Sequence, residues 1–158
     1  MFVIPAEDAD KRLVLLFDGV SGNSTVYLNG CLMKHNFCGY TSFEVDITDF
    51  AVIGGENVVA VYTNLQEHEG WWYEGAGIYR HVWLCKSDLV SIDLYGIYAK
   101  PVFDGERWTV ETEVTLRNDS LSSADVRVQG SIFDRDGALV SVAEGEVTVA
   151  EKDKATVR

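Results

Sequence analysis

The chain has 158 residues, a length that suits one domain or two small ones. Hydrophobic residues make up 47% of it and charged residues 24%, which fits a chain with a packed core and excludes a disordered linker. The net charge of −12 would repel phosphate and so excludes nucleic acid as a partner, and the lack of any run of about 18 apolar residues excludes a membrane-spanning helix.

Strand patterns dominate the first half of the chain. An apolar run at residues 13–17 ends at Asp18-Gly19, which predicts a buried strand followed by a turn. Residues 24–28 are rich in β-forming side chains and end at Asn29-Gly30, a dipeptide that strongly predicts a hairpin turn. The other strand patterns of this half are at residues 43–48, 57–62 and 78–84. No long amphipathic helix is predicted, which excludes α/β-barrel and doubly wound folds.

Beyond residue 87 the strand patterns alternate at period two, with turns at Asp104-Gly105 and Asp136-Gly137. The patterned segments are residues 91–98, 108–116, 126–133, 138–140 and 146–149. Strands at this spacing are typical of a β-sandwich, so we predict two consecutive all-β domains, residues 1–87 and 88–158. A seven-stranded sandwich needs about 100 residues, and only about 70 follow the boundary, which predicts that the second domain continues beyond residue 158.

Neither a metal nor a cofactor is predicted. The three histidines lack the spacing of metal ligands. Asp134 and Asp136 flank a turn and offer too few oxygen ligands for Ca²⁺, so we interpret them as turn residues. Asn118-Asp119-Ser120 fits the pattern of N-glycosylation, while the compartment is left open between cytoplasm, periplasm and secretion. The cysteines share no C-x-x-C spacing and are predicted to be free and buried: Cys31, Cys38 and Cys85.

An ordered set of motifs runs from residue 12 to residue 85. Its members are Phe17-Asp18-Gly19-Val20, Val26-Tyr27-Leu28-Asn29-Gly30, His35, Gly39-Tyr40, Phe43, Asp46-Ile47-Thr48, Gly55-Glu56-Asn57-Val58-Val59-Ala60-Val61 and the stretch from Glu69-Gly70-Trp71-Trp72 to Ile78-Tyr79-Arg80-His81-Val82-Trp83-Leu84. Together they resemble the sugar-binding domain of family 2 glycoside hydrolases, the group of β-galactosidases and β-glucuronidases. Residues 89–158 resemble the immunoglobulin-like domain that follows it in such enzymes.

This resemblance implies a jelly-roll-like β-sandwich, similar to a galactose-binding domain, over residues 1–87, and an immunoglobulin-like β-sandwich over residues 88–158. In this family the catalytic barrel and its two glutamates come after the immunoglobulin-like domain. The chain would therefore be a non-catalytic region of an exo-glycosidase similar to a β-galactosidase. Its partners would be the barrel and, through the parent enzyme, carbohydrate. By this interpretation the parent is an enzyme, whereas the chain alone contains no catalytic residue.

The resemblance also implies a loop at residues 66–75 that reaches over the barrel mouth and helps to shape the sugar pocket. Aromatic rings present apolar faces to the C–H surface of a pyranose, and carboxylates accept hydrogen bonds from its hydroxyls. The substrate-binding residues expected in the parent enzyme are Glu69, Trp71, Trp72, Tyr73 and Glu74. The alternative is that the tryptophans pack against a neighbouring domain as structural plugs.

One position in this loop departs from the family pattern. Trp71 stands where better-known members carry an aspartate, so the acidic sugar contact does not carry over there. Glu69 or Glu74 would supply it only along a different loop path. Retaining hydrolysis needs two carboxyl groups about 5–5.5 Å apart across the glycosidic bond, and nothing in the sequence places these two so.

Two other functions remain open from the sequence. A free-standing carbohydrate-binding module would need an aromatic platform that forms without the barrel. A purely structural sandwich would touch no sugar. Members of the family begin the first domain with additional strands, so residues 1–87 would be an N-terminally truncated domain. The missing strands would leave a sheet edge unpaired and surfaces that face the barrel exposed, which predicts a homo-oligomer of the isolated chain, by dimerisation or strand exchange.

Overall fold

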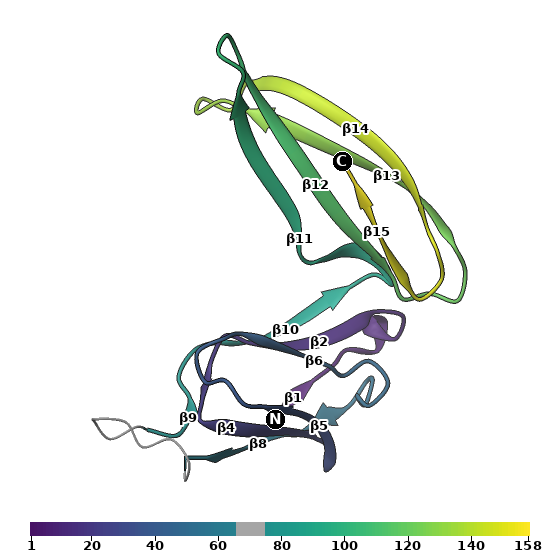
Figure 1. Ribbon diagram of the computed structural model, residues 1–158. Coiled ribbons are helices and arrows are strands. Elements are labelled where there is room, and N and C mark those ends of the chain that lie inside the picture. The colour runs from purple at the N-terminus through teal and green to yellow at the C-terminus, as the bar shows by residue number, and fades with distance from the viewer. Residues whose placement is uncertain (66–74) are drawn as a thin grey trace. The chain divides into compact units, whose positions relative to one another are not determined.

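The computed structural model describes residues 1–65 and 75–158, which divide into two compact units, Met1–Asp88 and Leu89–Arg158 (Figure 1). The regular structure of the described residues is β-strand, apart from a 3-10 turn (η1) at Ala6–Asp8. No helix in this part of the chain has the length and apolar character needed to cross a membrane. The prediction of an all-β fold is confirmed.

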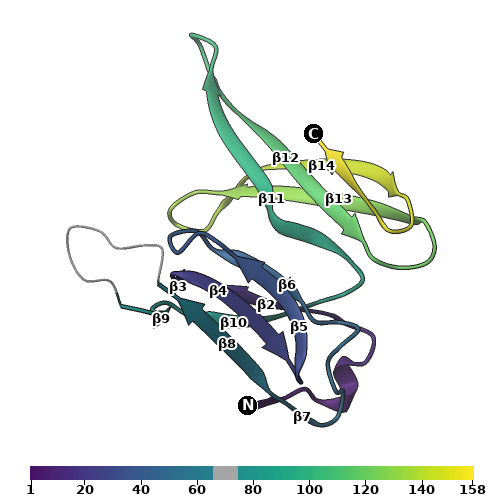
Figure 2. The ribbon, with the colours of Figure 1, turned by 60° about the horizontal axis from the view of Figure 1, so that its bottom comes forward.

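The first unit is a β-sandwich of two antiparallel three-stranded sheets, with strand orders β10-β2-β6 and β5-β4-β8 (Figure 2). Two short strand pairs, β1-β7 and β3-β9, complete it. The strands are β1 (Phe2–Val3), β2 (Arg12–Phe17), β3 (Val20–Ser21), β4 (Asn23–Leu28), β5 (Cys31–Asn36), β6 (Phe43–Asp46), β7 (Glu56–Asn57), β8 (Val59–Asn64), β9 (Gly77–Ile78) and β10 (Val82–Ser87).

The core of this unit lies between its two three-stranded sheets. β2 is the middle strand of its sheet, and five of its six residues are buried. Phe17 of β2 and Phe43 of β6 stack with ring centroids 5.0 Å apart and planes inclined by 7°. The buried apolar cluster consists of Ile4, Leu13, Leu15, Phe17, Val20, Val26, Leu28, Phe43, Val45 and Ile47.

The predicted hairpin at Asn29-Gly30 is confirmed between β4 and β5. Both turn residues have positive φ, 51° and 85°, as a type I′ turn requires. The Asn29 side chain donates from Nδ2 to Asn57 Oδ1 at 2.9 Å and accepts from the Val58 amide at 2.9 Å. Asn57 is fully buried and also exchanges two hydrogen bonds with the backbone of Val52, at 2.8 and 2.9 Å. The turn is therefore tied to the segment that enters β8.

The second unit contains one sheet of order β11-β12-β15 and a two-stranded sheet of β13 and β14. Its buried core is small, with Val114, Leu116 and Val149 at the centre. β15 pairs only with residues 114–118 of β12, so no strand of residues 89–158 pairs with that edge of β12 at residues 108–113. The strands are β11 (Val90–Phe103), β12 (Trp108–Asn118), β13 (Ala124–Phe133), β14 (Leu139–Val149) and β15 (Asp153–Val157).

A large bulge interrupts β11. Its register against β12 shifts between Ile92 and Ile97, and Tyr95 within the bulge has φ 55°. A Cβ atom on Gly96 would lie 2.6 Å from the carbonyl oxygen of Thr115 and 2.7 Å from that of Asp93. Only a residue without a side chain fits this close backbone approach, so Gly96 fixes the place of the bulge.

Asn118 ends β12 with a fully buried side chain. Its Nδ2 donates to the carbonyl oxygens of Ser122 at 2.8 Å and Val149 at 3.1 Å. Its Oδ1 accepts from the amide and the hydroxyl of Ser120, at 2.9 and 2.6 Å. The Asn-x-Ser pattern at this position therefore serves the fold, because the amide is enclosed and its hydrogen-bonding groups are engaged.

Asp93 is the centre of an ion-pair cluster in the second unit. It accepts a hydrogen bond from Arg117 Nε at 2.9 Å and another from Lys154 Nζ. Burial by itself would raise the pKa of Asp93, but the hydrogen bonds and charges of Lys154 and Arg117 outweigh burial and hold the pKa below its usual value of 3.8. The cluster joins β11, β12 and β15.

This cluster predicts an acid sensitivity of the second unit. Because the folded-state pKa of Asp93 is lower than its unfolded-state value, the unfolded chain takes up the proton more readily. The stabilisation is present above the unfolded-state pKa and is lost as the pH falls through the folded-state pKa. We expect Asp93→Asn to flatten the decline in urea midpoint between about pH 6 and about pH 2. An unchanged decline in the variant would contradict this role.

Two smaller predictions can be compared with the structure. The interpretation of Asp134 as a turn residue is confirmed, since its Oδ1 accepts from the amides of Asp136 and Ala138 at 2.9 and 2.8 Å. The three cysteines are free, but their predicted burial is wrong. Cys31 and Cys38 are exposed and Cys85 is half-buried. Cys31 directly follows the hairpin turn, a place that a count of cysteines and their spacing does not reveal.

Candidate functional site

The sugar-contact residues predicted from the sequence lie outside the residues that the structure describes, which stop at Leu65 and resume at Gly75. These are Glu69, Trp71, Trp72, Tyr73 and Glu74. Their roles stay predictions. The structure does describe the framework at both ends of the segment, and this framework determines where the chain leaves the sandwich and where it returns.

Short strands hold the two ends of the segment. β8 ends at Asn64, whose Cα partner on β4 is Asn23. On the return side, Ile78 of β9 pairs with Val20 of β3. β3 leads directly into β4, with only Gly22 between them, so one continuous stretch of chain supports both ends.

The backbone at Gly22 packs closely against the end of β8. Gly22 has φ 85°, and a Cβ atom there would lie 2.6 Å from Leu65 Cδ2 and 2.9 Å from the Asn64 carbonyl oxygen. A side chain at Gly22 would therefore displace the point where β8 ends. On the return side, Tyr79 donates from its hydroxyl to the carbonyl oxygen of Gly39 at 2.7 Å. The connection between β5 and β6 thus braces the chain just after β9.

An exposed polar and aromatic cluster lies beside this framework, where β2 ends and β10 begins. Trp83 Nε1 donates to Asp18 Oδ2 at 2.9 Å, and His81 Nδ1 lies 3.8 Å from the same oxygen. The ring centroids of His81 and Trp83 are 5.1 Å apart. A carboxylate, an imidazole and an indole together can offer hydrogen bonds and an apolar ring face to a polyhydroxylated ligand.

Sequence reasoning missed this cluster. The sequence predicts a turn at Asp18-Gly19 and a strand at Trp83, and both belong to the motifs of the family resemblance, but none of these patterns predicts their contact. The signal that could have found it is the antiparallel pairing of β10 with β2, which places the residues after β2 next to those before β10. Among residues 1–65 and 75–158, no group of three or more His, Cys, Asp or Glu side chains could hold a metal ion.

Comparison with known proteins decides the family. The family model of the sugar-binding domain of glycosyl hydrolases family 2 matches residues 1–88, more than half of the chain. The chain belongs to glycosyl hydrolase family 2. The resemblance seen in the sequence is therefore confirmed.

Curated relatives of this family 2 chain are long enzymes. It is 34% identical over 142 residues to the β-galactosidase BoGH2A of Bacteroides ovatus, covering 89% of the chain and 17% of that enzyme. It is 28% identical over 180 aligned positions to a β-glucuronidase of Formosa agariphila, covering 99% of the chain and 18% of the enzyme. The chain thus spans less than a fifth of the length of these carbohydrate-processing enzymes, and the remainder contains a much larger catalytic part.

Solved structures of family 2 enzymes are also similar to this chain. A family 2 glycosyl hydrolase from Bacteroides cellulosilyticus is similar with a TM-score of 0.90 and 30% identity, over 99% of this chain and 22% of that one. A β-glucuronidase of family 2 has a TM-score of 0.86 and 27% identity, also over 99% of this chain. The likeness therefore includes the second unit as well as the sugar-binding domain.

Proposed function

We propose that this family 2 chain is the non-catalytic region of an exo-glycosidase similar to a β-galactosidase, which supports the catalytic barrel and helps to shape the sugar pocket. The observation that carries the proposal is the match of residues 1–88 to the sugar-binding domain, within relatives named as β-galactosidases and β-glucuronidases. Residues 1–87 are the proposed jelly-roll domain, and residues 88–158 are the proposed immunoglobulin-like domain.

The proposed contribution to the pocket comes from Glu69, Trp71, Trp72, Tyr73 and Glu74 in the parent enzyme. The ends of this segment are held by β3 and β9 and by the packing at Gly22, so the segment starts and returns at fixed points of the sandwich. The exposed cluster of Asp18, His81 and Trp83 adds sugar-compatible groups next to its return point.

The first test assays hydrolysis with nitrophenyl β-galactoside and β-glucuronide. We expect no turnover by the 158-residue chain, because retaining hydrolysis needs a carboxyl pair that the proposal assigns to the barrel. In the full-length enzyme that carries the chain, Glu69→Gln and Trp71→Ala are each expected to lower kcat/KM at least about tenfold, the effect of losing one good polar or stacking contact.

Trp108→Ala is the matched control, because Trp108 is an exposed tryptophan of the second unit. It is expected to leave kcat/KM unchanged. Turnover by the chain alone would refute the non-catalytic role. Wild-type kinetics of both loop variants would show that these residues do not contact substrate.

The partners in this proposal are carbohydrate, the barrel and a second copy of the chain. The homo-oligomer is proposed for the isolated chain, because unpaired sheet edges favour pairing with another chain.

A further inference from the structure

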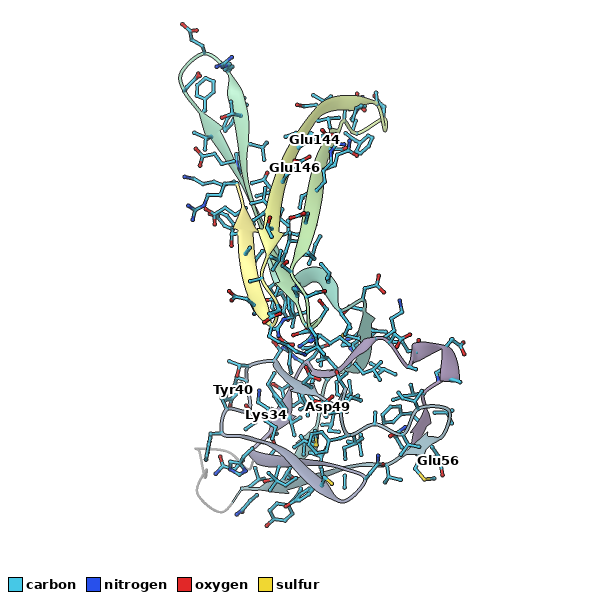
Figure 3. All side chains as sticks on the ribbon, turned by 90° about the vertical axis from the view of Figure 1, so that its right-hand side faces the viewer. Lys34, Tyr40, Asp49, Glu56, Glu144 and Glu146 are labelled. Atoms are coloured by element: carbon cyan, nitrogen blue, oxygen red, sulfur yellow. The ribbon has the colours of Figure 1, made fainter. Side chains whose placement is uncertain are left out.

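The outer face of the β5-β4-β8 sheet has a composition unlike the rest of the chain. These three six-residue strands contain a single residue with a formal charge, Lys34, whereas charged residues form 24% of the whole sequence. Lys34 is directed away from this face. Its Nζ donates to the carbonyl oxygen of Glu44 at 2.9 Å and lies 5.8 Å from the ring centroid of Phe43 on the other sheet. Lys34 is labelled in Figure 3.

Strand register arranges the outer side chains in rows. Ser24, Val26 and Leu28 of β4 are buried, so the alternate residues of this strand face outward. One row contains His35, Thr25 and Tyr62, and the next contains Leu32, Tyr27 and Ala60. A third row pairs Asn23 with Asn64. The side chains in these three rows include no carboxylate, ammonium or guanidinium group.

On this face, exposed aromatic side chains lie next to a polar pair. Thr25 is 8% exposed although it faces outward, and its Oγ1 lies 2.7 Å from His35 Nδ1. Tyr62, next to it, is 62% exposed, and the imidazole of His35 meets the ring of Phe37 edge-on with centroids 4.4 Å apart. Aromatic rings and the Thr25–His35 pair therefore lie on neighbouring strands of this face, and together they match the C–H faces and hydroxyls of a sugar.

Size separates a sugar from a protein partner. Three strands about 4.8 Å apart and about 20 Å long present roughly 300 Å². A stable protein interface buries about 800 Å² on each partner, so this face is too small to hold a second copy by itself. A short oligosaccharide needs no larger surface. The lack of cationic groups also disfavours acidic sugars, which would lose hydration without gaining an ion pair.

We propose that the outer face of the β5-β4-β8 sheet binds uncharged oligosaccharides, with Tyr27 and Tyr62 as stacking rings and the Thr25–His35 pair as its polar group. The proposal uses none of residues 66–74 and does not depend on their role in the parent enzyme. It gives the chain a carbohydrate affinity of its own, as in a binding module.

The test titrates the ¹⁵N-labelled 158-residue chain with galactotriose, cellotriose and, as the acidic comparison, glucuronic acid. We expect saturable shifts of backbone amides in β4, β5 and β8 with at least one neutral trisaccharide, and weaker shifts with glucuronic acid. Tyr62→Ala is expected to weaken that binding about tenfold, while Tyr62→Phe, which keeps the ring, stays within about threefold of the original affinity. The matched control is Tyr98→Ala, because Tyr98 is 59% exposed on the second unit.

Several outcomes would overturn the proposal. These are no saturable shifts with either trisaccharide, shifts confined to other strands, tighter binding of glucuronic acid, or an equal loss in Tyr98→Ala. Light scattering on the same samples tests whether this face is instead a contact between two copies of the chain. If Tyr62→Ala dissolves a dimer and leaves sugar affinity unchanged, the face is a contact between copies. The hydrolysis assays of the parent enzyme do not affect this result, so the two proposals fail independently.

Discussion

Replacing Phe17 with alanine is expected to lower the free energy of unfolding of the first unit by about 4 kcal/mol. Phe17 is fully buried, stacks on Phe43 and lies in the middle strand of its sheet. The substitution removes most of a large apolar side chain and leaves a space that the surrounding strands cannot close completely. Since domains are stable by only about 5–15 kcal/mol, this single change would populate unfolded forms of the unit.

The measurement is urea-dependent hydrogen exchange with peptide resolution, which reports each unit separately. Phe103→Ala is the matched control. Phe103 also has an aromatic neighbour, Trp108, with ring centroids 5.0 Å apart, but it is 51% exposed. Its replacement is expected to cost about 1 kcal/mol in the second unit, because little buried surface is lost. Equal losses for the two variants would mean that burial does not decide the stability of this sandwich.

Asn118→Ala is expected to lower the free energy of unfolding of the second unit by about 3 kcal/mol. The change deprives two buried carbonyl oxygens, those of Ser122 and Val149, of their shared donor, and it removes the acceptor of Ser120. Asn118→Asp tests the loss of the donor separately from the loss of the acceptor. It keeps an acceptor for Ser120 but sets a carboxylate against the two carbonyl oxygens, so it is expected to destabilise the unit at least as much at neutral pH.

The control for this pair is Gln129→Ala. The Gln129 amide is exposed and donates to Glu144 Oε1 at 3.1 Å, so its loss is expected to change the stability by less than about 0.5 kcal/mol. Hydrogen exchange in β12 and β14 measures all three variants. A loss below about 1 kcal/mol in Asn118→Ala would show that water replaces the amide at this strand end.

Local chemistry was sufficient to predict much of the fold. Asn29-Gly30 allows positive φ at both positions, and period-two alternation identifies residues that point to one side of a strand, so the hairpin and the all-β class followed from neighbouring residues alone. The bulge at Gly96 did not follow, because its cause is a backbone approach from Thr115, on another strand. Long-range pairing of this kind leaves no mark in a local pattern.

The same distinction applies to the candidate sites. The loop residues Glu69 and Trp71 were named through resemblance, and they stay predictions. The contact of Asp18 with Trp83 and the row formed by Thr25 and Tyr62 depend on register between strands that are distant in sequence. A change of register by one residue would turn either strand's outer side chains to the inner face, so only the pairing itself reveals which rings share a surface.

The place of β10 in the first unit has a consequence for biosynthesis. β2, at residues 12–17, has β6 on one side and β10, at residues 82–87, on the other, so its sheet is incomplete until the last strand of the unit has been made. At a synthesis rate of 5–20 residues per second, the roughly 70 residues from the end of β2 to the end of β10 take about 4–14 s. During that interval the edge of β2 that pairs with β10 is unpaired on the nascent chain. Expression at a lower translation rate therefore lengthens the period in which chaperones, rather than β10, must cover β2.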